Sequence, residues 1–201
     1  MTRDLSRFLL CAGLLTLGPG CGAPRPVDPP PETVRASQNE VILKEILAEG
    51  RDGDWLVVRG YHKGDKFVMK ATRTPISHAA VLDAGRREVV ESLADGVQVT
   101  PLEEFVNNCH HVLLVRPMWS DEDPAAGVRA LEVARSHIGQ KYDYLGTVGI
   151  DNKKRFYCSE LVFLSYEEFF GEKQDTPRFI EPDQLYLWGT ILYDSRPRNE
   201  W

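Results

Sequence analysis

Hydrophobic and polar positions between residues 36 and 201 alternate in blocks that predict several strands. Apolar and β-branched residues without helical spacing form these strand-like stretches. They are residues 55–59, 66–71, 76–82, 87–92 and 111–116, with a late strand or strand pair at 185–193. The turn residues 83–86 would join two of the stretches, 76–82 and 87–92, into an antiparallel hairpin.

Helical spacing marks three further segments. Ser37–Glu40 has the capping-box pattern, and an apolar stripe follows it up to Gly50. Asp123–Pro124 predicts the start of a second helix, which ends near Gly139. Residues 158–170 predict a third, apolar on nearly every face of its first half and therefore buried. Helices gathered around one mixed or antiparallel sheet predict an α+β domain over residues 36–201.

The first 35 residues differ in character from this domain. Residues 1–20 predict an export signal, because the apolar run at positions 8–17 is too short to span a bilayer. The segment resembles a bacterial lipoprotein signal, in which the cysteine after the apolar run, here Cys21, is lipidated. An ordinary signal peptide cleaved near Cys21 or Ala23 is the alternative. Residues 21–35 are rich in proline and predict an extended tether. We expect an exported protein anchored in the bacterial cell envelope, at the periplasmic face or the outer membrane.

Composition narrows the choice of partners. The chain has 42% hydrophobic and 27% charged residues, which is ordinary for one globular domain with a core. Its formal net charge is −6, and its longest basic run is Lys153–Arg155. Nucleic acid is therefore not an expected partner, because phosphate binding needs a concentrated positive surface.

Candidate chemistry centres on Cys158 and His78. Cys158 opens the predicted buried helix, where unpaired backbone N–H groups favour a thiolate and can receive an oxyanion. His78 lies in an apolar strand among small residues, so that another group can approach its ring closely. A thiol hydrolase needs such a pair, with the thiolate as nucleophile and the imidazole as proton carrier. A buried, inert cysteine and a core histidine are the alternatives.

A carboxylate would complete the site by orienting the imidazole. Glu91 lies on the next predicted strand, which the hairpin would bring beside His78. Glu88 and Asp83 are rivals for this role, and a solvated surface carboxylate is the alternative for all three.

Cys109 and the two histidines after it raise the question of a disulfide or a metal site. The hydrolase interpretation requires Cys109 to be buried and apart from Cys158, because a nucleophile cannot stay in a disulfide. Cys109–His111 lacks a second ligand pair at zinc spacing, so we expect no metal and no cofactor.

Four stretches together resemble the permuted papain-like amidases of the YiiX/YebB group, relatives of NlpC-type cell-wall peptidases. They are residues 52–58, 76–81, 89–92, and 139–144 leading to 157–161. The order is permuted, since the histidine precedes the cysteine. The resemblance implies a helix that carries the cysteine, packed on a small barrel-like sheet, and a triad of His78, Glu91 and Cys158. It also makes Tyr142 a secondary candidate for oxyanion binding.

The expected function is therefore a cysteine hydrolase (amidase or peptidase) that works through an acyl-enzyme. Its expected substrate is a peptidoglycan peptide or an acylated amino compound of the envelope. A thioesterase or acyltransferase on the same triad, and a non-catalytic envelope binding module, are the alternatives.

Overall fold

The computed structural model describes residues 27–146, 154–170, 177 and 179–201. The predicted export signal at residues 1–20 and the predicted lipidation site Cys21 lie outside the described residues. Among the helices that are described, none combines the length and the apolar character needed to cross a bilayer.

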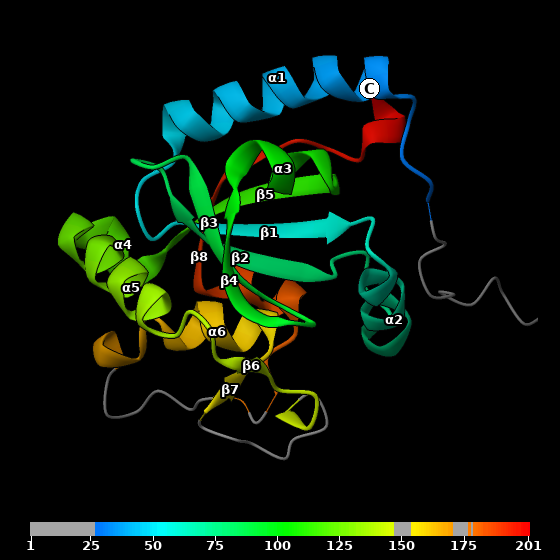
Figure 1. The fold of residues 1–201 in the computed structure, drawn as a ribbon. Coiled ribbons are helices and arrows are strands. Elements are labelled where there is room, and N and C mark those ends of the chain that lie inside the picture. The colour runs from blue at the N-terminus through cyan, green and yellow to red at the C-terminus, as the bar shows by residue number, and fades with distance from the viewer. Residues whose placement is uncertain (1–26, 147–153, 171–176, 178) are drawn as a thin grey trace, which may run out of the picture.

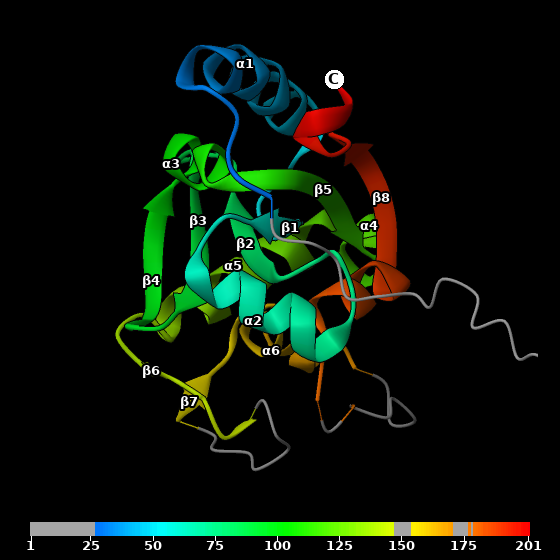
Figure 2. The same ribbon diagram turned by 90° about the vertical axis from the view of Figure 1, so that its right-hand side faces the viewer.

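A six-stranded antiparallel sheet forms the centre of the domain (Figure 1). Its strands lie in the order β4-β3-β2-β1-β5-β8 and curve around the core, as Figure 2 shows. They are β1 (Trp55–Gly60), β2 (His78–Asp83), β3 (Glu88–Leu93), β4 (Gly96–Pro101), β5 (Cys109–Pro117) and β8 (Gly189–Asp194). A second, two-stranded sheet pairs β6 (Lys141–Tyr142) with β7 (Arg155–Phe156) in parallel. The predicted α+β fold is confirmed.

Helices cover both faces of the main sheet. They are α1 (Glu32–Glu49), α2 (Lys63–Thr72), α3 (Leu102–Asn107), α4 (Met118–Glu122), α5 (Pro124–Ser136) and α6 (Cys158–Leu164). Single turns or short runs of 3-10 helix occur at Glu167–Phe169, Pro182–Trp188 and Arg198–Glu200. In Figure 1, α1 and α3 lie above the sheet, and α5 and α6 lie on its other side.

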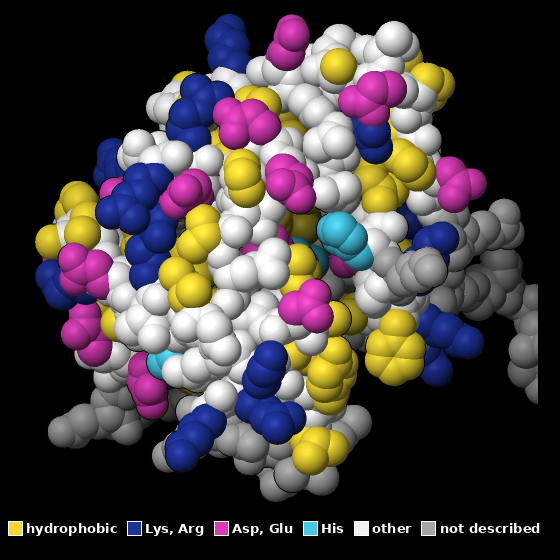
Figure 3. All heavy atoms as spheres, in the orientation of Figure 1, with side chains coloured by type: hydrophobic (Ala, Val, Ile, Leu, Met, Phe, Trp, Pro, Cys, Tyr) yellow, Lys and Arg dark blue, Asp and Glu magenta, His cyan; other side chains and the backbone are white. Residues whose placement is uncertain are grey.

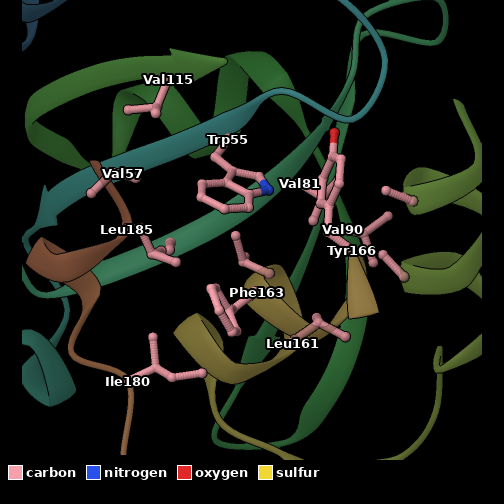
Figure 4. Close-up of a cluster of buried hydrophobic side chains, with 14 of the residues drawn as sticks. Trp55, Val57, Val81, Val90, Val115, Leu161, Phe163, Tyr166, Ile180 and Leu185 are labelled. Carbon is pink, nitrogen blue, oxygen red and sulfur yellow. The ribbon is translucent and has the colours of Figure 1, made fainter. Parts of the chain in front are cut away.

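Two hydrophobic clusters fill the space between sheet and helices. The larger one joins α5 and α6 to one face of the sheet, and Figure 4 shows Phe163 and Leu161 of α6 pointing at the strands. The smaller one joins α1 and α3 to the other face through Ile42 and Ile46. Each such side chain contributes about 1.5–3 kcal/mol when it is fully buried, so the two clusters fix α6 and α1 on opposite faces.

The predicted strand at residues 66–71 is wrong, because this segment is the helix α2. Of its apolar residues, Met69 is buried whereas Phe67 is 73% exposed, so the short apolar run does not fill a sheet position. The helix is favoured locally by Asp65, whose carboxylate accepts a hydrogen bond from the His62 backbone N–H at 2.7 Å. β4, α3 and α4 are further elements that the sequence pattern did not indicate.

Two predicted helix boundaries also shift. α1 begins at Glu32, directly after Pro31, so residues 32–35 of the expected tether are helical. Proline is tolerated just outside the first turn, where its missing N–H removes no helical hydrogen bond. The helix predicted at residues 158–170 ends at Leu164 and is followed by turns.

A buried arginine near the C-terminus links α1 to the rest of the domain through hydrogen bonds. Arg198 is 3% exposed. Its guanidinium donates to the backbone oxygens of Cys109 and Val106 and to the side-chain oxygens of Gln38 and Asn39 in α1. The end of the chain therefore lies against its first described helix.

The glycine at the start of β1 permits a close approach of two backbones. Gly53 has a φ of 89°, and a Cβ there would lie 2.2 Å from the backbone oxygen of Gly127 in α5. The adjacent Asp54 is buried and forms an ion pair with Arg116 at 2.9 Å. Gly53 thus permits α5 to pack against the start of β1, and Asp54 links β1 to β5.

Candidate active site

His78 and Glu91 form a buried pair at one end of the sheet. His78 is the first residue of β2 and is 8% exposed. Its Nε2 lies 2.6 Å from Oε2 of Glu91 on β3. The antiparallel pairing of β2 with β3 sets Glu91 opposite Ala80, two residues beyond His78 and on the same face of the sheet. The predicted hairpin therefore brings these two side chains together.

Thr100 on β4 holds the second oxygen of the carboxylate. Its hydroxyl donates a hydrogen bond to Oε1 of Glu91, which leaves Oε2 for His78. Glu91 is 3% exposed, so both oxygens of a buried carboxylate have partners. The rotamer of Glu91 is thereby fixed from two sides.

Cys158 reaches His78 from the opposite face of the sheet. It is the first residue of α6 and is buried, and its interaction with the His78 ring helps to raise the pKa of that ring. The Ser92 hydroxyl donates to the backbone oxygen of Phe156 at 2.6 Å and ties β7 to β3 just before the cysteine. The Ser159 hydroxyl donates to the backbone oxygen of Ile180 at 2.7 Å, just after it. Cys158 is thus held from both sides along the chain.

The electrostatics of the pair favour a charged imidazole. Burial lowers the pKa of His78, but hydrogen bonds and charge attraction from Cys158 and Glu91 more than offset burial and hold this pKa well above its usual value. Burial raises the pKa of Glu91. The hydrogen bond and the charge of His78, followed by the hydrogen bond from Thr100, lower this pKa by more, so it lies below its usual value. An imidazolium can therefore lie between a carboxylate and the sulfur of Cys158.

The rival carboxylates lie elsewhere. Asp83 and Glu88 both form ion pairs with Arg135 of α5, the second at 2.8 Å. Neither of them is hydrogen-bonded to His78. Of the three carboxylates that the sequence offered, the structure brings Glu91 to the histidine.

Cys109 is buried away from the nucleophile position. Cys109 and Cys158, the cysteines among the described residues, are both free thiols. The Cys109 thiol donates to the backbone oxygen of Phe105 at 3.1 Å. Burial, together with the negative charges of Asp65 and Glu91, raises its pKa well above the usual value. Cys109 therefore stays protonated, in contrast to what a nucleophile needs.

The two histidines after Cys109 have partners of their own. His110 Nδ1 lies 3.2 Å from the Tyr61 hydroxyl, and His111 Nε2 lies 2.6 Å from Oδ1 of Asp194. Within the described ranges, no group of three or more His, Cys, Asp or Glu side chains is arranged to hold a metal ion. The expectation of no metal site and no cofactor stays a prediction.

A small cavity opens beside the His78–Glu91 pair. Its volume is about 50 Å³. This is room for one or a few water molecules. Its walls come from α2, α3 and five strands and include His62, Asp65, Gln98, Thr100, Glu104 and Asn108. Apolar side chains, among them Val58 and Phe105, complete the lining, so the space beside Glu91 is mixed in character.

Tyr142 lies close to the cysteine through the small second sheet. It pairs with Phe156, two residues before Cys158. Burial, followed by the negative charge of the Cys158 sulfur, raises the pKa of its hydroxyl, which therefore remains a hydrogen-bond donor. Its ring packs against Tyr144, with the ring centroids 4.8 Å apart.

Sequence reasoning missed Thr100 and Ser92 as parts of this site. Thr100 lies on β4, and the short polar–apolar alternation of residues 96–101 was the signal that could have revealed this strand. Ser92 directly follows Glu91, so by alternation it points to the α6 face, where it meets Phe156. Its role depends on the packing of β7, which local sequence does not encode.

The geometry agrees with a match between this chain and a known family. The sequence profile of the permuted papain-like amidase enzymes, the YaeF/YiiX or C92 family, matches residues 52–186. This span is more than half of the chain and contains His78, Glu91 and Cys158. The chain belongs to the permuted papain-like amidases.

A solved structure supports the fold of this amidase. The crystal structure of the metalloprotein YiiX from Escherichia coli O157:H7 is similar, with a TM-score of 0.50 and 21% sequence identity. The match covers 59% of this chain and 65% of the YiiX chain, so this chain spans slightly less than two thirds of that relative. At this identity the likeness shows the permuted papain-like fold alone. No curated protein matches the chain in sequence.

Proposed function

We propose that this amidase cleaves an amide bond with Cys158 as nucleophile, His78 as proton carrier and Glu91 as the residue that orients His78. One observation carries the proposal: Thr100, Glu91 and His78 are hydrogen-bonded in series, and Cys158 is close enough to His78 to help raise the pKa of its ring. The same order of nucleophile, base and orienting acceptor defines catalytic triads on unrelated folds.

In the first half of the reaction, His78 holds the proton of the Cys158 thiol and the thiolate attacks the carbonyl carbon. A carbon–sulfur bond forms, and the carbonyl π electrons move to the oxygen. When this tetrahedral species collapses, the carbon–nitrogen bond breaks and His78 gives its proton to the departing amine. The products are a free amine and a thioester on Cys158.

In the second half, a water molecule attacks the thioester while His78 accepts a proton from it. The carbon–sulfur bond breaks, the carboxylic acid leaves, and the proton returns to the Cys158–His78 pair. Glu91 keeps the ring oriented throughout, because its Oε2 bonds Nε2 and so directs Nδ1 to the sulfur.

Two donors near Cys158 are suited to the oxyanion. One is the backbone N–H of Cys158 itself, which lies in the first turn of α6 and has no helical acceptor. The other is the Tyr142 hydroxyl, whose raised pKa keeps its proton in place. Both donor roles are proposed.

The proposed substrate is an amide of the cell envelope, either a peptidoglycan peptide or an acylated amino compound. The signal-like segment at residues 1–20 supports a location outside the cytoplasm. The test compares hydrolysis of peptidoglycan fragments and of acyl-lysine compounds by the purified chain under identical conditions. We expect at least one class to release a primary amine at a rate that depends on Cys158. Release of thiol from thioesters alone, with neither amide class cleaved, would contradict amide hydrolysis.

No step of this mechanism passes through a metal. YiiX is described as a metalloprotein. In the part of this chain that the structure describes, however, no group of three or more His, Cys, Asp or Glu side chains is arranged to hold a metal ion. The side chains of His78 and Glu91 are bonded to each other and are already assigned to proton transfer.

Replacing Glu91 by glutamine should lower turnover by about 10²–10⁴-fold without abolishing it, because the imidazole then loses the partner that sets its orientation and tautomer. The measurement is kcat on whichever amide substrate is cleaved. Glu88→Gln is the matched control, since Glu88 lies three residues earlier on the same strand and bonds Arg135. Full activity of Glu91→Gln together with loss of activity in Glu88→Gln would show that the orienting residue is misassigned.

A further inference from the structure

The helix α2 presents an unusual surface to solvent. Phe67 on this helix is 73% exposed, the highest value among the large hydrophobic residues of the described chain. Lys66 and Lys70 lie beside it and are also exposed, and the exposed Arg73 follows at the end of the helix. The four side chains together are called the α2 surface below.

Helical geometry places these side chains on one arc. At 100° per residue, Lys66, Lys70 and Phe67 fall within one third of a turn. The one acidic residue of α2 is Asp65, and it is buried on the opposite side. No ion pair joins Lys66 or Lys70 to a carboxylate of the described residues. The α2 surface is therefore basic and apolar, on a chain whose formal net charge is −6.

The inner side of α2 is fixed to the active-site end of the sheet. Asp65 accepts the His62 N–H at 2.7 Å and lies against Gly60 at the end of β1, where a Cβ would meet its carboxylate at 2.3 Å. His62 and Asp65 also line the cavity that contains His78 and Glu91. Figures 1 and 2 show α2 beyond the end of β1, with its outer side uncovered by the other labelled elements.

The space-filling view agrees with this description. Over α2, at the right of Figure 3, hydrophobic surface lies directly beside Lys and Arg side chains. An exposed phenylalanine costs free energy in water, and basic side chains around it resist burial against another apolar protein surface. A partner with anionic groups above an apolar interior would bind the basic side chains and bury the phenylalanine ring at the same time.

We propose that the α2 surface docks on an anionic phospholipid bilayer. Lys66, Lys70 and Arg73 would contact the headgroups, and the Phe67 ring would enter the boundary between headgroups and acyl chains. A soluble polyanion would match the charges but would leave Phe67 in water. Docking in this way sets the cavity beside His78 and Glu91 next to the membrane plane, independently of any lipid on the N-terminal segment.

The test follows amide hydrogen exchange of residues 64–72 in the full chain, which reports on α2 even where the N-terminal segment also binds vesicles. With vesicles of phosphatidylglycerol and phosphatidylcholine, exchange of α2 should slow as lipid is added. The variant Lys66→Gln/Lys70→Gln should need about 25-fold more lipid for the same protection, since each lysine near an anionic surface contributes about a fivefold change in binding. Phe67→Ser should need about tenfold more.

Matched controls lie on α1, where Val41 is 44% exposed and Lys44 is exposed. The variant Val41→Ser/Lys44→Gln should behave as the wild type. Equal protection by pure phosphatidylcholine vesicles, equal protection by a soluble polysulfate, or no change in the α2 variants would each overturn the proposal. Hydrolysis of a soluble amide should be unaltered in the α2 variants, so failure here is distinguishable from failure of the proposed triad.

Discussion

Replacing Cys158 by serine should lower amide turnover by more than about 10⁴-fold while leaving the fold intact. The hydroxyl of serine is a far weaker nucleophile than a thiolate, and the His78–Glu91 pair that serves a thiolate does not ionise it. Serine also fits the site, because it differs from cysteine only in carrying oxygen in place of sulfur. The measurements are kcat on the cleaved substrate and the thermal unfolding midpoint.

Cys109→Ser is the control for this result. Both cysteines are buried free thiols, but Cys109 bonds a backbone oxygen whereas Cys158 faces His78. The control should keep most of the wild-type turnover, even where its stability falls by about 1 kcal/mol from placing a hydroxyl in an apolar environment. Turnover that survives in Cys158→Ser and is lost in Cys109→Ser would reverse the assignment of the nucleophile.

Replacing His78 by alanine should also reduce turnover by more than about 10⁴-fold, and it should change the reactivity of Cys158. The raised pKa of His78 means that its ring remains protonated to higher pH than a free histidine does. A positive charge beside the sulfur favours the thiolate, which is the form that iodoacetamide alkylates. Labelling of Cys158 at pH ~6.5 should therefore be fast in the wild type and much slower in His78→Ala.

The raised pKa of His78 also determines how the stability of the fold changes with pH. Because the folded-state pKa of His78 is raised, the charged pair contributes to stability below the unfolded pKa of about 6.5, and this contribution is lost as pH rises through the folded value.

In the wild type, Cys158 should be labelled well before Cys109 at pH ~6.5. Labelling of Cys158 that is unaffected by His78→Ala, in folded protein, would contradict the proposed proton transfer.

The sequence indicated the site better than the architecture around it. Cys158, His78 and Glu91 could be proposed because each lies in a segment with a strong local pattern: a buried helix start, a small-residue strand and its hairpin partner. Choosing Glu91 over Asp83 and Glu88 required the register of β2 and β3 and the position of Arg135. Residues far apart in sequence decide that choice, so no local pattern contains it.

Elements with weak patterns were mispredicted. The apolar run of α2 predicts a strand because short apolar runs fit both structures, whereas the cap from Asp65 and the exposed Phe67 belong to a helix. β4 went unnoticed although it supplies Thr100, since two valines separated by one residue are too short a signal. The residues that support the site were thus less predictable than the three proposed catalytic residues.

Arg198 bears on the order in which the reacting residues occur along the chain. By joining the C-terminal turn to Gln38 and Asn39, it brings the two ends of the described domain together. A linker from Trp201 to the start of α1, with new ends opened at the exposed residues 121–123, would give a chain in which Cys158 precedes His78. The residues of the site would keep their places in the fold, because none of them lies at the new ends. The order of cysteine and histidine along the chain therefore depends on where the chain begins and ends, and the proposed reaction does not depend on that order.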